Sequence, residues 1–215
     1  MGGREGRDER RMPMLLLHRR RRHLARSQPG DRSRGAVLVE AAFITPLFFV
    51  LVLGIIEFSL AMNDDLALAH SVRAGSRVAS ASGNDVYADY GILQAIKRES
   101  AALGEDKIER IVVYEATGPG EGPTDTCKGG TPSSICNVYD AADLTLDKDK
   151  FGCREVEELD KYWCPTDRKV SLAAGGTDYV GVWMQVRHPY VTRMFGRAVT
   201  LTDQSVIRLE PRVKA

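Results

Sequence analysis

An apolar segment of twenty-seven residues near the N-terminus constrains this sequence more than any other feature. It runs from Ala36 to Met62, and its only charged residues are Glu40 and Glu57. Because an α-helix rises about 1.5 Å per residue, this length is sufficient to cross a hydrocarbon core of ~30 Å. The alternative is a buried helix of a soluble domain, but a helix that is apolar on all sides and follows an Arg-rich block suits that setting poorly. The sequence therefore predicts one transmembrane helix at 36–62.

Charge is divided sharply at the start of this segment. The chain of 215 residues has a formal net charge of only +1. Residues 1–34 contain eleven Arg and no Lys against four acids, a net of +7, which leaves −6 for the rest. Because basic flanks are retained in the cytoplasm, we expect a cytoplasmic leader at 1–35 and a single-pass protein of the cell membrane. The leader contains no aromatic residue, which favours a topological signal over a nucleic-acid site.

Composition limits the remaining classes. A mean hydropathy of −0.24 with 43% hydrophobic and 27% charged residues excludes a polytopic membrane protein and a wholly disordered chain. The apolar run is also too long for a secretory signal peptide. One membrane span with a globular domain is the organisation that remains.

The junction between the leader and the apolar segment carries a second pattern. Gly35 precedes Ala36, and Glu40 is then the fifth residue of the apolar segment. This resembles the site that prepilin peptidases cut, where cleavage follows the Gly and the acid is residue five of the mature chain. A carboxylate near lipid is costly and normally has a partner. The resemblance implies that Glu40 neutralises the amine of a neighbouring subunit and sets the register of assembly; the alternative is a carboxylate that snorkels to the interface.

From Arg34 onward the sequence resembles the N-terminal module of the TadE-like family, pseudopilins of the tight-adherence (Tad or Flp) pilus systems. The matching residues are Arg34-Gly35-Ala36, Val39-Glu40, Phe43, Pro46, Gly54, Glu57-Phe58, Arg73, Gly75, Arg77 and Ala79. Ala41 departs from the pattern of major Flp pilins, which have Tyr there, and argues against the main shaft subunit. The resemblance implies a structural minor pseudopilin, not an enzyme, that needs no cofactor. Its implied partners are a prepilin peptidase, an inner-membrane pilus platform, other pilin-like subunits and the membrane, and the resemblance extends to incorporation into the pilus.

Two residues within the apolar segment need separate interpretation. Glu57 lies seventeen residues after Glu40, ~25 Å further along a helix and near the opposite face of a membrane. A carboxylate at the outer interface and an intersubunit contact are equally compatible with that position. Pro46 lacks an amide donor and its ring clashes with the carbonyl of Ala42, so we expect a helix kink there.

Beyond the membrane we expect a stem and a head. Residues 63–83 should continue the helix, which Gly83-Asn84 then stops. Small residues along the stem would let another element approach closely; they are Ala67, Ala74, Gly75, Ala79 and Ser80. Residues 84–215 should form an extracytoplasmic α+β head on the pilin plan. Its expected elements are a helix at 87–103, strands at 107–116, 178–188 and 198–210, and a long loop at 117–134.

Four cysteines lie in the middle of the predicted head: Cys127, Cys136, Cys153 and Cys164. Their spacing does not match the short pairs of zinc sites, and an even number outside the cytoplasm favours disulfides. Of the three possible pairings we favour the sequence-local one, Cys127–Cys136 with Cys153–Cys164.

A partial calcium-loop pattern lies in the middle of the head sequence. Asp147, Asp149 and Glu158 occupy ligand positions of an EF-hand loop, but Phe151 stands where another oxygen ligand is expected. A solvated turn that leads into a helix at 155–163 is the favoured alternative, so this is only a weak calcium candidate and we expect no metal. No nucleophile motif, phosphate loop or metal-binding helix indicates catalysis. An uncleaved, membrane-anchored binding protein is the alternative function.

Overall fold

The computed structural model describes residues 30–172 and 176–211, with side chains from Gly35 onward. The chain divides into two compact units, residues 1–47 and residues 48–215. The described part of the first unit is the beginning of helix α1 (Gly30–Ser82). The second unit contains the rest of α1 and all later elements. Most of the predicted leader, residues 1–29, lies outside the described residues.

Helix α1 joins the predicted membrane segment and the predicted stem in one element. It begins at Gly30, before the expected start at Ala36, and continues through Pro46 without interruption of the helix. The helix ends at the expected stop signal. Gly83 has a φ of 58°, a conformation that favours glycine, and its amide donates to the carbonyl of Ala79 at 3.1 Å.

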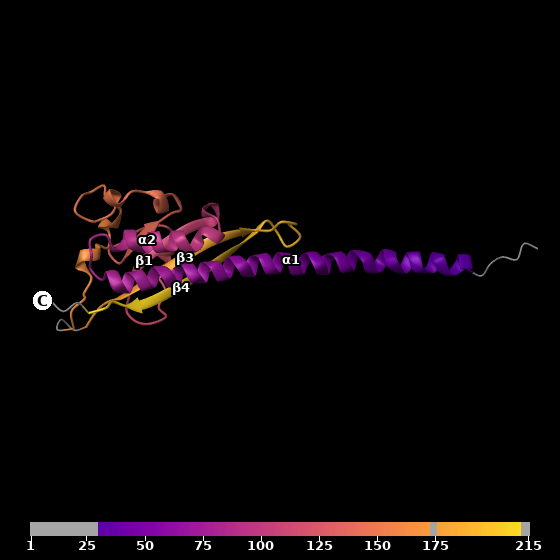
Figure 1. Cartoon of the computed structure of the whole chain (residues 1–215), viewed down its shortest axis with the longest axis horizontal. Helices are drawn as coiled ribbons and strands as arrows, with labels where there is room; N and C mark the ends of the chain where they lie inside the picture. Colours follow the sequence, from indigo (N-terminus) through magenta and orange to yellow (C-terminus); the bar gives the residue numbers. More distant parts are fainter. Residues whose placement is uncertain (1–29, 173–175, 212–215) are drawn as a thin grey trace, which may run out of the picture. The chain divides into compact units, whose positions relative to one another are not determined.

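The second unit contains a four-stranded antiparallel sheet, which confirms the α+β class. The strands are β1 (Ile108–Ala116), β2 (Cys136–Tyr139), β3 (Tyr179–Pro189) and β4 (Ala198–Arg208), in the spatial order β2-β1-β3-β4. Strands β3 and β4 form a long hairpin that lies beside α1 (Figure 1). Three of the four strands, β1, β3 and β4, match the expected ones within two residues at every end. Strand β2 was not expected, because four residues are too few for an alternating pattern.

Alternation along β1 and β3 divides the buried side chains between the two faces of the sheet. On one face, Ile111, Val113, Val182 and Met184 belong to the main core, which also contains residues of α1 and of α2 (Ala88–Glu99). On the other face, a smaller core contains Val112, Tyr114, Trp183 and the first cysteine pair. Tyr114 lies opposite Gly181, and a Cβ at Gly181 would stand 2.1 Å from its ring, so the ring needs glycine there.

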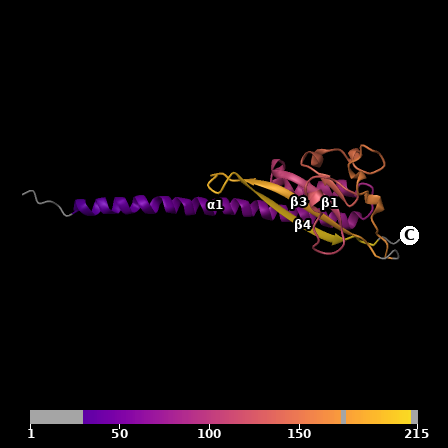
Figure 2. The ribbon, with the colours of Figure 1, turned by 180° about the vertical axis from the view of Figure 1, so that it is seen from behind.

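The C-terminal part of α1 packs on α2 and on β4 (Figure 2). Leu68, Val72 and Ala79 are fully buried in the main core. A Cβ at Gly75 would lie 3.0 Å from Ile96 of α2, so the small residues of the stem do admit another element. Two serine hydroxyls bind the backbone of β4: Ser76 donates to the carbonyl of Ser205 at 3.0 Å and Ser80 to that of Arg208 at 2.9 Å.

The remaining segments are short helical turns and loops. They include α3 (Asp125–Lys128) and the 3₁₀ turns η1 (Ser100–Ala102), η2 (Glu105–Lys107), η3 (Ala142–Thr145), η4 (Lys148–Lys150), η5 (Leu159–Lys161) and η6 (Pro165–Asp167). The expected helix at 155–163 is wrong, because only η5 forms there. The backbone amide of Asp160 donates to the carbonyl of Gly152 at 3.0 Å, and this bond folds the segment back on itself as a loop.

Candidate functional site

The junction residues lie on an exposed helix surface of the first unit. Gly35 and Glu40 are exposed, and a Cβ added to Gly35 would meet nothing within 4 Å. Large apolar side chains surround Glu40 on all sides of the helix; Val37, Leu38, Val39, Phe43, Ile44 and Leu47 are each 55% exposed or more. The side chain of Arg34 lies outside the described residues. Such a surface suits lipid or neighbouring helices and is costly in water.

Among the described residues, one helix is long and apolar enough to cross a membrane. It spans Gly35–Ser82, and none of its most apolar window is buried against the rest of the structure. A core helix of a soluble protein would bury that window. The length, composition and exposure of this helix therefore agree with the expected single membrane anchor.

Glu57 has partners within the second unit, which the sequence did not reveal. Its side chain is only 1% exposed. The carboxylate accepts hydrogen bonds from the backbone amides of Val191, at 3.1 Å, and Thr192, both in the loop that joins β3 to β4. The loop of the same chain therefore covers the acid, a contact that the position of Glu57 along the helix did not indicate.

About two turns further along α1, a second acid ties the helix to the sheet. Oδ2 of Asp64 lies 2.7 Å from Nζ of Lys107 and 2.6 Å from Nδ1 of His188 at the end of β3. Asp64 and His188 are almost fully buried, and Nε2 of His188 has no hydrogen-bond partner in the described structure. Both acids thus hold elements of the head against α1.

A third polar cluster lies inside the head and centres on Asp89 of α2. Nη2 of Arg168 is 2.6 Å from Oδ1 of Asp89, and neither side chain is exposed. The amide of Asn137 donates to Oδ2 of the same carboxylate at 2.9 Å. The Arg168 guanidinium also lies 4.2 Å from the centre of the Trp163 ring. This cluster joins α2, β2 and the loop before β3, and a buried ion pair of this kind is costly to break.

The hydroxyl of Tyr139 connects Asp89 to another buried acid. It lies 2.9 Å from Oδ2 of Asp89 and 2.6 Å from Oδ1 of Asp160. One hydroxyl has one proton, so two contacts with carboxyl oxygens require a second proton, which a protonated Asp160 supplies. Burial, and then the charge of Asp89, raise the pKa of the Asp160 carboxyl to about 8. Burial also raises the pKa of the Tyr139 hydroxyl well above its usual value.

Two disulfides join the loops of the head, in agreement with the expectation from the cysteine count. Cys127 pairs with Cys136, and Cys153 pairs with Cys164, the sequence-local arrangement. The first bond ties α3 to the start of β2. The second closes the loop that carries Asp160 on its inner side. Disulfides of this kind are typical of proteins outside the cytoplasm.

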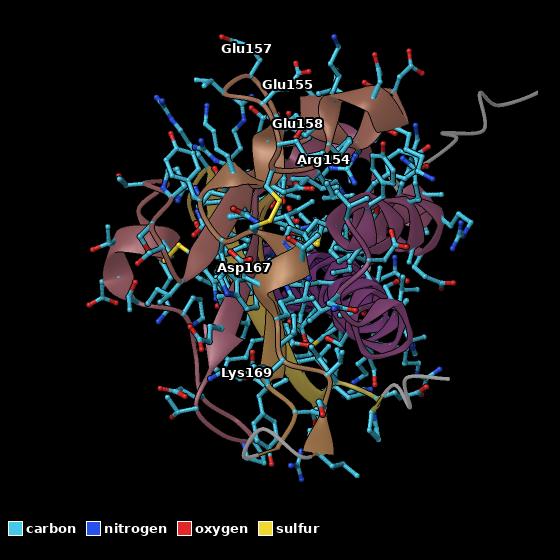
Figure 3. The ribbon with its side chains drawn as sticks, turned by 90° about the vertical axis from the view of Figure 1, so that its left-hand side faces the viewer. Arg154, Glu155, Glu157, Glu158, Asp167 and Lys169 are labelled. Carbon is cyan, nitrogen blue, oxygen red and sulfur yellow. A yellow bond between two sulfur atoms is a disulfide. The ribbon has the colours of Figure 1, made fainter. Side chains whose placement is uncertain are left out.

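The outer side of the second disulfide loop, 153–164, is strongly charged and contains Glu158, one of the three residues of the calcium candidate. Figure 3 labels Arg154, Glu155, Glu157 and Glu158 along this loop. The Glu158 carboxylate turns back and accepts from the amides of Arg154 and Glu155, while Asp149 lies 3.9 Å from Lys150. Within residues 30–172 and 176–211 no three His, Cys, Asp or Glu side chains lie together so that they could hold a metal ion. The structure therefore does not bring Asp147, Asp149 and Glu158 together as ligands.

The remaining residues of the sequence pattern fall into buried and exposed positions. A Cβ added to Gly54 would lie 3.4 Å from the Phe195 ring, and Gly75 is buried against α2. Phe58, Arg73 and Arg77 are exposed. The glycines therefore have packing roles within this chain, while the exposed residues are available to partners.

These observations define a class of protein: a single long helix, apolar and exposed in its first part, carries a disulfide-bonded α+β head. The sequence model of TadE-like proteins matches residues 35–77, which confirms the expected resemblance to that family over this segment. The matched segment begins at Gly35 and covers the apolar part of α1 and most of the stem. No curated protein and no solved structure matches the chain. The TadE-like match supports a role associated with Tad pili, in a family of structural components with pilin-like partners.

Proposed function

We propose that this chain is a minor pseudopilin of a Tad-type pilus system. Residues 1–35 are a cytoplasmic leader, 36–62 span the membrane, 63–83 form the stem and 84–215 form the head on the far side. The observation that carries the proposal is the TadE-like match, which starts at Gly35 and includes Glu40. The two disulfides support a head outside the cytoplasm.

The proposed processing step is hydrolysis of the peptide bond after Gly35 by a prepilin peptidase. Water adds to the Gly35 carbonyl, and Ala36 leaves with a free α-amino group that is protonated at neutral pH. Glu40 lies four residues after Ala36 on the same face of α1. If the new amine of one copy pairs with Glu40 of its neighbour, the two helices are offset along their axes by about 6 Å. The charge pair then sets the register between subunits.

The test of processing is the intact mass of the protein purified from the membranes of its own host. We expect the unaltered chain to begin at Ala36 and a Gly35→Leu variant to keep its leader, because a bulky side chain occupies the cleavage position. Ser59→Ala is a matched control on the same helix, since the Ser59 hydroxyl donates only to the carbonyl of Ile55. A leader retained in the unaltered chain would contradict the proposal and favour the uncleaved membrane-anchored binding protein.

The test of assembly is the Glu40→Ala variant. We expect normal insertion, because removal of a charge makes the segment more apolar, and a severalfold loss of the protein from sheared surface pili or from the assembly complex. Ser59→Ala should leave both unchanged. If the Glu40→Ala variant were incorporated in the same amount as the unaltered chain, the role assigned to this carboxylate would be contradicted.

A further inference from the structure

The loop that joins β3 to β4 carries exposed apolar and basic side chains together. This β3–β4 loop comprises residues 190–197. Val191 is 74% exposed, Met194 43% and Phe195 58%, and the side chains of Arg193 and Arg197 are also exposed. Within the described structure, no carboxylate forms an ion pair with either arginine. The head elsewhere keeps most of its large apolar side chains inside.

The β3–β4 loop lies against the outer part of the apolar segment of α1 (Figure 1). The Phe195 ring packs on Gly54, and the amides of Val191 and Thr192 bind Glu57. An open hollow of ≈ 260 Å³ is lined by Gly54, Glu57, Phe58, Ala61, Tyr190 and Phe195. A second, almost wholly apolar hollow is also lined by Phe195, together with Val50, Leu51 and Ile55. Apolar surface therefore continues from the helix onto the loop.

The length of the apolar segment determines where a membrane would end along this surface. The whole segment, 36–62, is ~40 Å long as a helix, which exceeds a hydrocarbon core of ~30 Å. The part that precedes the loop contact, 36–53, is ~27 Å long and is sufficient to span that core. The contact at Gly54–Ala61 is thus at the depth where acyl chains give way to headgroups.

The chemistry of the loop fits that depth. Aromatic and apolar side chains with adjacent arginines are favoured at the membrane–water boundary, where the apolar groups reach the acyl chains and the cations meet phosphates. Glu57 would oppose such insertion if it were bare. The backbone amides of the loop satisfy its carboxylate, so the only acid of this region is removed from lipid.

We propose that the β3–β4 loop is a second membrane contact, with Val191, Met194 and Phe195 in the interface and Arg193 and Arg197 on lipid phosphates. The partner is an anionic phospholipid surface, and acyl chains occupy the hollows beside Phe195. The loop thereby fixes the head close to the membrane at a defined depth. The inference requires that α1 spans a membrane but is independent of cleavage after Gly35 and of a pilus role.

The test uses the full chain in phospholipid vesicles with one fluorescent label. All described cysteines are in disulfides, so a thiol introduced by Met194→Cys can carry an environment-sensitive dye. Val156→Cys is the matched control, because Val156 is 79% exposed in the second disulfide loop of the same head. We expect blue-shifted emission at position 194 only, with severalfold stronger quenching by lipids that bear a nitroxide near the headgroup.

Two further measurements separate lipid from a second copy of the chain. Phosphatidylglycerol added to phosphatidylcholine should increase the quenching at position 194, and Arg193→Glu with Arg197→Glu should abolish that increase. Dilution of the protein in lipid should leave the quenching unchanged. Water-like emission at position 194, or a blue shift that disappears on dilution, would overturn the proposal; the second result would assign the surface to contact between copies.

Discussion

The apolar part of α1 exposes its apolar side chains, whereas the head buries its apolar side chains together with several charged ones. Between Val37 and Ile56 the helix exposes its large apolar side chains and carries one acid, Glu40, on its surface. The head encloses its apolar residues and also buries Asp89, Asp160 and Arg168. The first region therefore depends on a surrounding apolar phase, whereas the second provides a partner for each of its buried acids. Helix α1 belongs to both regions, because its first part is exposed and its C-terminal part packs in the core of the head.

The transition occurs at the two acids that face the head. Glu57 and Asp64 are nearly unexposed, and each binds groups from the β3–β4 region. Before Glu57 the helix has little cover from its own chain, and after Asp64 it belongs to the main core. These acids therefore mark the boundary between the part that needs lipid and the part that folds on itself.

The largest effect should come from loss of the buried ion pair in the head. Asp89→Asn leaves the Arg168 guanidinium buried without a counter-charge, which typically costs about 3–5 kcal/mol. We expect denaturant unfolding of the full chain in detergent, followed by Trp fluorescence, to show this loss while helical signal from α1 persists. Asp125→Asn is the matched control, because the Asp125 side chain is fully exposed. A loss below about 1 kcal/mol in the Asp89 variant would show that the head does not depend on this pair.

The second effect compares the same substitution in the two regions. Leu68 is fully buried in the main core, so Leu68→Ala should reduce the free energy of unfolding of the head by about 2–5 kcal/mol. Leu47 is 63% exposed, and Leu47→Ala should change it by less than about 0.5 kcal/mol. Both variants are measured in the full chain in the same detergent. Equal losses would contradict the division of α1 into a lipid-facing and a self-packed part.

The local elements could be predicted from the sequence because a pattern of neighbouring residues indicates each of them. The apolar run predicted the membrane-spanning candidate, alternation predicted β1, β3 and β4, and Gly83 predicted the end of α1. The polar clusters could not be predicted in this way. Asp89, Tyr139 and Asp160 are far apart in sequence and meet only when α2, β2 and the second disulfide loop pack together.

The errors have related physical causes. The segment 155–163 is rich in helix-forming residues, but its closure by Cys153–Cys164 and by the Gly152–Asp160 backbone bond overrides that preference. The partners of Glu57 were missed, because the two amides that bind it come from residues more than 130 positions later. Sequence spacing along one helix carries no information about a loop of a distant hairpin.

The last predicted effect is a dependence of head stability on pH that is spread over several pH units. The Asp160 carboxyl keeps its proton in the fold up to about pH 8 but loses it near 3.8 in the unfolded chain. The stability that this proton supplies is therefore complete below pH 3.8 and is lost as the pH rises through 8, with a slope of at most about 1.4 kcal/mol per pH unit. The lipid-facing part of α1 should show no such dependence on Asp160.

Asp160→Asn isolates this contribution, because an amide reproduces the hydrogen-bond pattern of the protonated acid. Its NH₂ group donates to the Tyr139 oxygen, its carbonyl accepts from the amide of Gly152, and it does not titrate. We expect the unfolding free energy of this variant to fall less steeply between pH 5 and 8 than that of the unaltered chain, since the proton no longer has to be held. Asp149→Asn, at an exposed site, should retain the steeper slope. Parallel curves for the unaltered chain and the Asp160 variant would mean that the second proton of the Tyr139 contacts is not on Asp160, and that the buried acids of the head are ionised together.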